Sequence, residues 1–461
     1  MTTPRVLVVG GGIAGLAAAL ELLDAGGHSV EVWEADARWG GKISTSPFAG
    51  LDHVDEAADA FLTRVPHGVA FAERVGVDGA QLTSPTEARA AVWHGRLHDI
   101  PDGILLGVPA AILPFVTTGL LSLRGKLRAG LEPLVPRTDA DDSLGRLIRA
   151  RFGDEVHERL VDALVGSIYA TDTDHASLAS IPQLDALARS HRSLLLGGRA
   201  LRRRASVPAG AGPIFATPHL GMGALIAAAV DAIGAAGGGL HLERRAGDIR
   251  SDGDAWRVDD ERFDALVLAS PARVTAPLVN GCLPDLAVGL ASFEHADIVM
   301  VRLAVPGGEW PERLAGRSGY LVPKPDQRTV SAVSFGSQKW AHWRPDDGSQ
   351  IVRISLGRDG LPTAHLGDDQ LLERAITETG HHLDLDLHPT HMSVTRWTDA
   401  FPQYRPHHGD RVSALEGALP PTVALAGASY HGIGVPACIA SGRRAARSIA
   451  AATGDRTGLL P

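Results

Sequence analysis

Apolar runs and helical spacing alternate along the N-terminal segment of the chain. Residues 6–9 form a short aliphatic run, residues 30–33 alternate around Glu31, and apolar residues between 13 and 23 recur every three or four positions. Short runs of this kind are typical of strands buried on both faces, whereas the spacing between them is typical of a helix. The pattern therefore predicts a strand, a helix and a second parallel strand, the beginning of an α/β fold.

Three glycines join the first predicted strand to the helix at G-x-G-x-x-G spacing. In such turns the first glycine permits the tight bend, the second leaves room for a pyrophosphate, and the third lets the helix approach the strand. An acidic residue ends the second strand, where it can accept a hydrogen bond from a ribose hydroxyl. The spacing predicts a dinucleotide site, with a purely structural turn as the alternative. Its expected contacts are Gly10, Gly12, Ile13, Ala14, Gly15, Glu34 and Ala35.

A long helical pattern extends from residue 86 to about 205. Ser143 is expected to cap a helix, and apolar residues recur after it at helical spacing as far as residue 168. Arginine and lysine are frequent in this stretch. Most of them are expected on solvated helix faces, and a minority can form forks that bind carboxylates.

Strand patterns return in the second half of the chain. An alanine-rich helix that ends near residue 236 and a buried strand at 263–271 indicate a return to the N-terminal unit. A helix at 368–380 is predicted to cover a mixed sheet. The strands of that sheet are predicted from alternating apolar positions at 299–303, 319–322, 329–334 and 351–355.

The C-terminal pattern combines a strand with a helix start. The apolar run from 423 ends at Gly427 and Ala428, and a helix is predicted to begin near Gly434 and Val435. The first N–H groups of a helix have no partner within it, and they carry the positive end of its dipole. We expect them to stabilise negative charge on a ligand beyond the strand, with a structural turn as the alternative.

Composition and charge narrow the class of protein. A chain of 461 residues that is 44% hydrophobic is expected to form two or three domains. Its net charge of −9 argues against nucleic acid as a partner. Cys282 and Cys438 lack metal-ligand spacing, and so do the histidine pairs at 381–382 and 407–408, so no metal site is expected. The low cysteine content fits a reduced, cytoplasmic setting, and no signal peptide is expected.

The segment 103–123 carries no charged residue and is long enough to span a membrane. Pro109, Pro114 and glycines interrupt it, and such breaks disfavour a spanning helix. We therefore expect a buried or interfacial hairpin. Loose, peripheral attachment to a membrane surface through this segment stays open.

The residues after Glu34 indicate which dinucleotide is bound. Glu34-Ala-Asp-Ala-Arg38-Trp-Gly40-Gly41-Lys42 resembles the E-x-x-x-R-x-G-G-[RK] extension of flavoproteins of the amine-oxidase and protoporphyrinogen-oxidase superfamily. The resemblance implies FAD as the cofactor. It also implies that Gly41 and Lys42 contact the cofactor, with Lys42 as a partner for its phosphates.

A second loop of the resembled flavoproteins passes beside the flavin ring with a G-P-x-x-F-L sequence. Here the corresponding residues are Ala57, Ala58, Asp59 and Ala60, followed by Phe-Leu, so two alanines replace Gly-Pro. The departure leaves the detailed contacts with the ring open. Arg64 follows this loop and is either a contact for an anionic substrate or an ordinary surface arginine.

Longer motifs resemble one branch of this superfamily. In these motifs, and over nearly its whole length, the chain resembles the oxygen-dependent protoporphyrinogen/coproporphyrinogen oxidases of bacterial haem synthesis. The middle segment is most similar to the Gram-positive branch, whose members act on coproporphyrinogen III. The motifs are Gly11-Gly-Ile-Ala-Gly-Leu-Ala-Ala, the segment 107–126, Ser167-Ile-Tyr-Ala170, Phe401-Pro-Gln-Tyr404, Gly427-Ala-Ser-Tyr430 and Pro436-Ala-Cys-Ile439.

The resemblance implies an α/β fold, α+β overall, in which three domains are interleaved. A Rossmann-like FAD-binding domain is expected from 1–85, 215–275 and 395–461. A mixed-sheet substrate domain is expected from 276–394, and a helical domain that faces substrate or membrane from 86–214. Ala246 is expected near the adenine, Trp397 at the cofactor, and Gly427, Ala428, Gly434 and Val435 at the ring. Tyr169 is expected to line the substrate cavity, and the alternative is that it packs in the core.

The implied activity is the FAD-dependent oxidation of coproporphyrinogen III to coproporphyrin III in haem biosynthesis, with release of hydrogen peroxide. Six electrons leave the macrocycle, which a two-electron flavin takes up in three rounds. The protein then has to position and desolvate the macrocycle rather than supply a nucleophile. A porphyrinogen and dioxygen are the expected partners, and a membrane surface and another enzyme of the haem pathway are further candidates.

Other functions stay open. Protoporphyrinogen IX carries two propionates and coproporphyrinogen four, so the basic helical stretch favours the latter substrate. An amine oxidase would need an aromatic pair, and only Tyr430 is found where that pair is expected. A carotenoid desaturase should not share the segment 114–126. A protein that binds FAD or porphyrin without turnover is kept open by Ala57 and Ala58.

Overall fold

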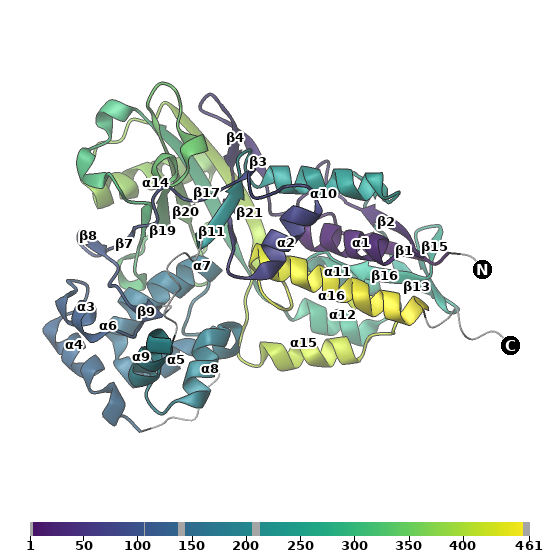
Figure 1. Ribbon diagram of the computed structural model, residues 1–461, viewed down its shortest axis with the longest axis horizontal. Coiled ribbons are helices and arrows are strands. Elements are labelled where there is room, and N and C mark those ends of the chain that lie inside the picture. Colours follow the sequence, from purple (N-terminus) through teal and green to yellow (C-terminus); the bar gives the residue numbers. More distant parts are fainter. Residues whose placement is uncertain (1–2, 106, 137–142, 205–212, 455–461) are drawn as a thin grey trace.

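The N-terminal pattern folds as predicted. The computed structural model describes residues 3–105, 107–136, 143–204 and 213–454. In it β1 (Arg5–Val9), α1 (Ile13–Ala25) and β2 (Ser29–Trp33) form a strand–helix–strand unit. They belong to a five-stranded parallel sheet of order β12-β2-β1-β16-β22, completed by β12 (Gly239–His241), β16 (Ala265–Leu268) and β22 (Val423–Leu425). Segments from three distant parts of the chain therefore build one sheet (Figure 1).

Both faces of this sheet are covered, which explains why its inner strands β1 and β16 are almost entirely apolar. Val6 and Val8 pack on the side of α1, α10 (Gly223–Ala235) and α16 (Val435–Gly454). Leu7 and Val9 pack on the opposite side, with α11 (Ala272–Val279) and α12 (Pro284–Ala291). A small antiparallel sheet lies on that second side and consists of β13 (Ile249–Asp252), β14 (Ala255–Val258) and β15 (Glu261–Phe263).

The predicted mixed sheet is confirmed, but it is wider than predicted. Its seven strands have the order β21-β17-β20-β19-β18-β7-β8, and α14 (Asp368–Leu383) packs on it. Only β7 and β18 pair in parallel. The strands are β7 (Ala90–Trp93), β8 (Leu97–Asp99), β17 (His295–Val305), β18 (Gly319–Leu321), β19 (Val330–Phe335), β20 (Gln350–Leu356) and β21 (His391–Pro402).

Two predicted boundaries need correction because of this sheet. β7 and β8 come from the stretch 86–214 that was predicted to be helical, and most of β21 comes from 395–461, which was predicted to belong to the cofactor part. β7 is too short to show a period of its own. Its strand conformation depends on pairing with β18, which is more than two hundred residues away in the sequence.

The segment 103–123 forms a short hairpin and then turns helical. β9 (Ile104–Leu105) pairs with β10 (Val108–Pro109), as predicted, and α3 (Ile112–Thr117) and α4 (Leu123–Gly130) follow. Among the described residues no helix is long and apolar enough to cross a membrane. The predicted hairpin is therefore confirmed for β9 and β10, whereas the residues from Ile112 to Thr117 are helical.

The helical part lies beside the mixed sheet (blue in Figure 1). Ser143 caps α5 (Leu144–Phe152) as predicted, since its side chain accepts a hydrogen bond from the Arg146 N–H at 3.4 Å. The elements after it are α6 (Asp154–Val156), a π-helical stretch η2 (His157–Gly166), α7 (Ser167–Tyr169), α8 (Pro182–Ser190) and α9 (Leu194–Arg204). Shorter elements elsewhere are β3 (Thr45–Phe48), β4 (Leu51–Asp55), β5 (Phe61–Leu62), α2 (Pro66–Arg74), β6 (Leu82–Thr83), η1 (Glu132–Leu134), η3 (Leu178–Ser180), β11 (Phe215–Pro218), α13 (Gly336–Lys339) and α15 (His408–Gly417).

A buried ion pair holds the helical part together. The Glu132 carboxylate in η1 is fully buried and pairs with the buried guanidinium of Arg151 in α5, whose Nε donates at 2.8 Å. It also accepts from the hydroxyl of Ser193 and from the backbone N–H of Leu194 at the start of α9. One carboxylate thus connects three elements.

Replacing Glu132 should therefore destabilise the protein strongly. Glu132→Ala leaves the Arg151 charge buried without its partner, a change that typically costs about 3–5 kcal/mol. The matched control is Asp185→Ala, which removes the half-buried partner of the exposed Arg189 on α8 and should cost under about 1 kcal/mol. Denaturant unfolding followed by circular dichroism compares the two. Equal losses in the free energy of unfolding would show that Glu132 contributes no more to stability than Asp185 does.

Candidate functional site

The start of α1 has the features of a phosphate site. Gly12 is the N-cap residue, and no side chain caps the helix there. A Cβ placed on Gly12 would meet only the Gly40 carbonyl oxygen, at 4.0 Å, so open space lies over the helix start. Ile13 and Ala14 are buried in the first turn, and their N–H groups cannot find partners within the helix. An anion would satisfy these donors.

The carboxylate of Glu34 lies beside the glycine turn. Its Oε2 accepts from the Gly11 N–H at 2.7 Å and its Oε1 from the Asp36 N–H at 2.9 Å. Ala35 is exposed next to it, and Ala246 is buried in the chain segment that follows β12. These contacts fix the carboxylate, and its remaining lone pairs can accept from a ribose hydroxyl.

One residue at this end was missed by the sequence analysis. The Arg244 guanidinium lies 3.6 Å from the centre of the Trp33 ring, and its backbone N–H donates to the Glu34 carbonyl at 2.8 Å. Arg244 directly precedes Arg245 and Ala246, where the adenine was predicted. Nothing in its sequence context distinguished it from a surface arginine.

The second helix start lies at the same edge of the parallel sheet. Gly10 and Gly427 both lie against the Ala269 backbone at the end of β16, because β1 and β22 flank that strand. Gly427 has φ +117°, a conformation that favours glycine. A Cβ on Gly434 would meet only the Pro436 ring, at 3.9 Å, so the start of α16 also faces open space.

Tyr404 fixes the loop between β22 and α16. Its hydroxyl donates to the Ala428 carbonyl at 2.6 Å and accepts from the Gly432 N–H at 2.7 Å. Its ring stacks on His408 with 3.8 Å between ring centres. In the sequence Tyr404 stands out only as part of the motif Phe401-Pro-Gln-Tyr404, which predicts no role for its hydroxyl.

Lys42 extends from the glycine turn toward β21. A Cβ on its neighbour Gly41 would lie 3.4 Å from the Gly12 Cα, whereas the Lys42 ammonium donates to the Ala400 carbonyl in β21. Burial lowers the pKa of Lys42 to about 8. On the same strand the Trp397 ring lies under the Arg38 guanidinium, at 5.9 Å from the ring centre. The structure thus gives Lys42 protein contacts at β21 besides its predicted role at the phosphates.

The loop at 57–60 is clamped by cations from the mixed sheet. The Asp59 carboxylate is bound by Lys339 at 2.8 Å, by Arg353 at 3.1 Å and by the Trp340 indole N–H at 3.0 Å. Arg353 also donates to the Ala57 carbonyl at 2.5 Å. Burial would raise the pKa of Asp59, but the two cations outweigh it and hold that pKa well below its ordinary value. The clamp holds the loop in one conformation without the Gly-Pro pair.

The clamping arginine could have been suspected from the sequence. Arg353 stands at an interior position of the apolar run 351–355, and Arg302 stands likewise within 299–303. Both are buried, and Arg302 donates to Ser46 and to the Val54 carbonyl at 3.1 Å each. A charged residue within a buried strand needs a partner, so it indicates a polar contact across domains.

An apolar surface adjoins Trp397. Ala170, Ile298 and Met300 form a small buried cluster, against which Trp397 and Phe401 pack. Tyr169 directly precedes Ala170 and is half-buried against the helical core. Burial raises the pKa of its hydroxyl, so Tyr169 stays neutral and can only donate or accept hydrogen bonds.

Arg64 lies apart from these contacts. It is exposed in the loop between β5 and α2, and it forms no ion pair with the described part of the chain. Its neighbours Leu62 and Val65 are exposed as well. Its proposed role toward an anionic substrate therefore rests on the sequence alone.

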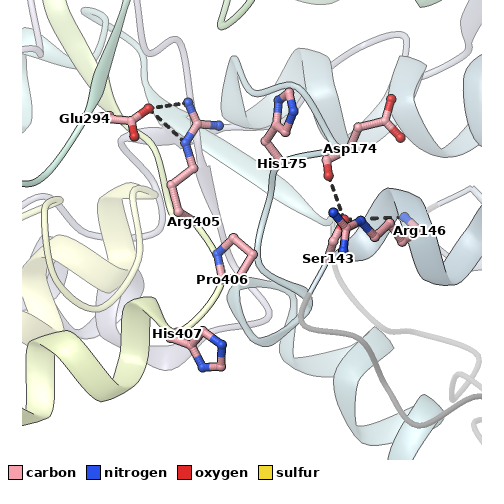
Figure 2. Close-up of a pocket in the computed structure, with 8 residues that line it drawn as sticks. All are labelled: Ser143, Arg146, Asp174, His175, Glu294, Arg405, Pro406 and His407. Carbon is pink, nitrogen blue, oxygen red and sulfur yellow. Dashed lines mark hydrogen bonds and ion pairs between the residues drawn. The ribbon is translucent and has the colours of Figure 1, made fainter.

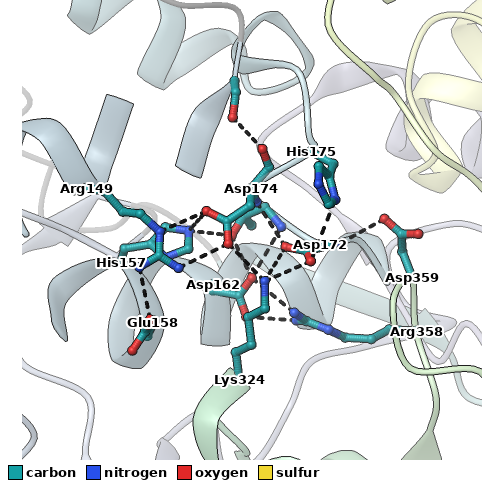
Figure 3. A network of polar contacts seen from close by, with 12 residues as sticks. Arg149, His157, Glu158, Asp162, Asp172, Asp174, His175, Lys324, Arg358 and Asp359 are labelled. Carbon is teal, nitrogen blue, oxygen red and sulfur yellow. Dashed lines mark hydrogen bonds and ion pairs between the residues drawn. The ribbon is translucent and has the colours of Figure 1, made fainter. Parts of the chain in front are cut away.

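A network of charges joins the helical part to the mixed sheet (Figure 3). Lys324 donates to Asp172 at 2.6 Å and to Asp174 at 2.9 Å, and Arg358 binds the fully buried Asp162 at 2.9 Å. Lys324 and Arg358 come from the sheet side, and the three aspartates come from the helical side. The network fixes the segment that carries Tyr169 and Ala170.

A cleft of about 560 Å³ opens beside this network and shares Asp174 and His175 with it (Figure 2). None of the described residues that line it was predicted as a site residue. Arg405, at its rim, is already paired with Glu294 at 2.6 Å and with Asp359 at 2.7 Å. The remaining lining residues are Ser143, Arg146, Asp174, His175, Pro406 and His407.

The donor set and open space at the two helix starts fit a dinucleotide whose pyrophosphate lies on α1 and whose far end reaches α16. Gly10, Gly41 and Gly427 allow the backbone to turn closely around this space, since each has a positive φ. Among the described residues no group of histidine, cysteine and carboxylate side chains could hold a metal ion.

Comparison with known proteins agrees with this geometry. Coproporphyrinogen III oxidase of Propionibacterium freudenreichii is 33% identical over 96% of this chain and 90% of the relative. That of Bacillus subtilis is 29% identical over 96% and 97%. The solved structure of an Exiguobacterium protein assigned as a protoporphyrinogen oxidase matches with a TM-score of 0.84 and 26% identity, over 97% of this chain and 99% of that one. The predicted α/β fold is confirmed.

A family model described as flavin containing amine oxidoreductase matches residues 13–450. The match includes both helix starts and the whole of the mixed sheet. It confirms the predicted cofactor, FAD, and the predicted oxidoreductase class. The chain therefore belongs to the flavin containing amine oxidoreductase family.

Proposed function

We propose that this protein oxidises coproporphyrinogen III to coproporphyrin III, with FAD as its cofactor and dioxygen as the electron acceptor. The observation that carries the proposal is the extent of the similarity to coproporphyrinogen III oxidases. It covers 96% of the chain and 90% of the Propionibacterium freudenreichii enzyme, and thus includes the helical part as well as the cofactor site.

The chemistry balances with the groups at hand. The macrocycle loses six electrons and six hydrogens, and three molecules of dioxygen become three of hydrogen peroxide. Bound FAD supplies two-electron transfer from the carbon skeleton to dioxygen. The substrate therefore has to be presented to one site three times or turned within it.

The role of the protein in this reaction is to bind and orient. The N–H groups at α1 would hold the diphosphate, and those at α16 would face the ring carbonyl that gains negative charge. Tyr404 fixes the α16 loop, and Lys339 and Arg353 fix the loop at 57–60. Trp397 and Phe401, which are half-buried and pack on Ile298 and Met300, would contact one face of the macrocycle.

Residues of the charge network and its neighbours also hold Ala170, which belongs to the same apolar cluster. Ala170 has a left-handed backbone with φ +49°, and its carbonyl accepts from the Asp359 N–H at 3.0 Å. Gln403 donates to the same carbonyl at 3.4 Å. Asp359 in turn pairs with Arg405. The junction thereby sets the position of Tyr169 relative to β21.

Protoporphyrinogen IX is the alternative substrate, supported by the assignment of the Exiguobacterium relative. The two substrates differ at the rim, where coproporphyrinogen carries four carboxylates and protoporphyrinogen two. Exposed cations that bind carboxylates therefore discriminate between the two porphyrinogens more than apolar contacts with the macrocycle do. Arg64 is our candidate for such a contact, because it is exposed and forms no ion pair with a described residue.

The helical part also offers a surface for peripheral membrane contact. Leu123 and Leu127 on α4 are 74% and 64% exposed, and Arg124 is exposed between them. Leu113, Val116, Leu131 and Leu134 nearby are exposed too. Exposed leucines beside basic residues are typical of surfaces that lie in a lipid interface.

Anaerobic titration tests the reaction. Under nitrogen, coproporphyrinogen III should bleach the bound FAD completely at one third of a molar equivalent, because each molecule delivers six electrons. Protoporphyrinogen IX, titrated in parallel, should bleach it more slowly. Absorbance that stays oxidised with both porphyrinogens would contradict the proposed function.

Arg64→Ala should raise the apparent KM for coproporphyrinogen III about tenfold and leave kcat unchanged, on the strength of one charged hydrogen bond. Arg64→Lys should retain most of the affinity. Arg250→Ala, which removes an exposed arginine on β13, is the matched control. Unchanged steady-state kinetics in Arg64→Ala would remove this residue from the substrate site.

Leu123→Glu/Leu127→Glu should abolish co-sedimentation with vesicles that contain anionic lipid, because it places charge on the apolar face of α4. Val288→Glu, at a residue of α12 that is 71% exposed, is the control for an exposed apolar residue elsewhere. If the unmodified protein does not sediment with vesicles, the proposal of a membrane contact is wrong.

A further inference from the structure

The strand β21 contains a bulge between Trp397 and Phe401. In this stretch of its pairing with β17, residues 398–400 lie opposite the single residue Asp297. Asp399, in the middle of the bulge, has a left-handed backbone with φ +49°. Such a backbone is unfavourable for residues other than glycine and persists where its surroundings hold it. Bulges are common beside active sites, where they redirect side chains.

Side chains from three directions hold the backbone of this bulge. The Asp399 N–H donates to the Asp297 carboxylate at 2.6 Å, and the Ala400 carbonyl accepts from the Lys42 ammonium. The Asp399 carboxylate pairs with Arg273 of α11 at 3.1 Å. The bulge is therefore fixed by the facing strand of the mixed sheet and by two segments of the cofactor part.

The bulge directly follows the larger aromatic side chain of the apolar surface. Trp397 is half-buried and packs on the cluster that includes Ile298, the residue that faces it on β17. A cavity of about 70 Å³ lies on its other side, and Asp297, Trp397 and Thr398 are among the residues that line it. Because Trp397 borders a cavity as well as packed side chains, its position depends more on its backbone than it would in a closely packed core.

We propose that Asp297 is a positioning residue for the oxidation of the porphyrinogen: it accepts the Asp399 N–H, thereby fixes the bulge, and so sets the position of Trp397 against the macrocycle. This role rests on the proposed function, in which Trp397 contacts one face of the substrate. Asp297 acts through Trp397 and takes part in no bond-making step. If Asp297 served local stability alone, its loss would destabilise the protein and leave the affinity for the macrocycle unchanged.

Asp297→Ala tests this role, because it removes the acceptor of the Asp399 N–H. The probe is coproporphyrin III, the fluorescent product of the proposed reaction, which the enzyme does not turn over. Its dissociation constant from the folded holoenzyme should rise about tenfold, the usual effect of losing one hydrogen bond to a charged group. Asp297→Asn keeps an oxygen acceptor and should stay within about threefold of the wild type.

The matched control is Asp347→Ala. Asp347 also accepts a backbone N–H, that of Ser349 at 2.9 Å, but it lies near the far end of β17, where Gln350 pairs with Val305. Its loss should leave the dissociation constant of coproporphyrin III unchanged.

A double variant tests whether Asp297 acts through the Trp397 ring. Trp397→Ala removes the ring, so adding Asp297→Ala should weaken binding by much less than Asp297→Ala does in the wild type. Fold-changes that multiply in the double variant would show that Asp297 acts independently of Trp397, and would overturn the proposal.

Asp399 offers a second way to change the bulge should Asp297→Ala fail to fold. Asp399→Val disfavours the left-handed backbone and should also raise the dissociation constant, whereas Asp399→Gly can adopt that backbone and should stay closer to the wild type. Equal affinity in the wild type, Asp297→Ala and Asp399→Val would overturn this proposal and leave the proposed function intact. A wild-type holoenzyme that does not bind coproporphyrin III would contradict both.

Discussion

The close packing of α1 against its neighbours is the constraint on which the rest of the site depends. A Cβ on Gly15 would overlap the Gly10 carbonyl oxygen, and one on Gly442 would overlap the Ala14 carbonyl oxygen. The two glycines let α1 lie directly on β1 and on α16. Because β1 and β22 both flank β16, this packing places the starts of α1 and α16 at one edge of the parallel sheet. One extended cofactor can then reach both.

Ion pairs join the cofactor part, the mixed sheet and the helical part to one another. Asp59 in the cofactor part is held by Arg353 and Lys339 of the mixed sheet, and the mixed sheet is joined to the helical part through Lys324 and Arg358. Each junction consists of charges with low exposure, and removing one partner would leave the other buried. We infer that these junctions fix the geometry of the macrocycle surface more than they add stability.

Local patterns in the sequence were sufficient for the parallel sheet and both helix starts. Gly12 caps α1 at the turn that the G-x-G-x-x-G spacing predicts, and α16 begins at Val435, near which its start was predicted. The assignment of 90–99 to helices was wrong, since those strands depend on pairing with β18. Tyr404 and Arg244 were missed because their roles depend on partners such as Gly432 and Trp33, which only the fold brings near.

In the proposed reaction the protein couples aromatisation of a porphyrinogen to reduction of dioxygen at FAD. The most direct measurement follows oxygen uptake and coproporphyrin fluorescence together in a sealed cell that contains holoenzyme and coproporphyrinogen III. We expect three molecules of dioxygen to be consumed and three of hydrogen peroxide to be formed for each molecule of coproporphyrin. Porphyrin formation no faster than without enzyme, or oxygen uptake unconnected to porphyrin formation, would contradict it.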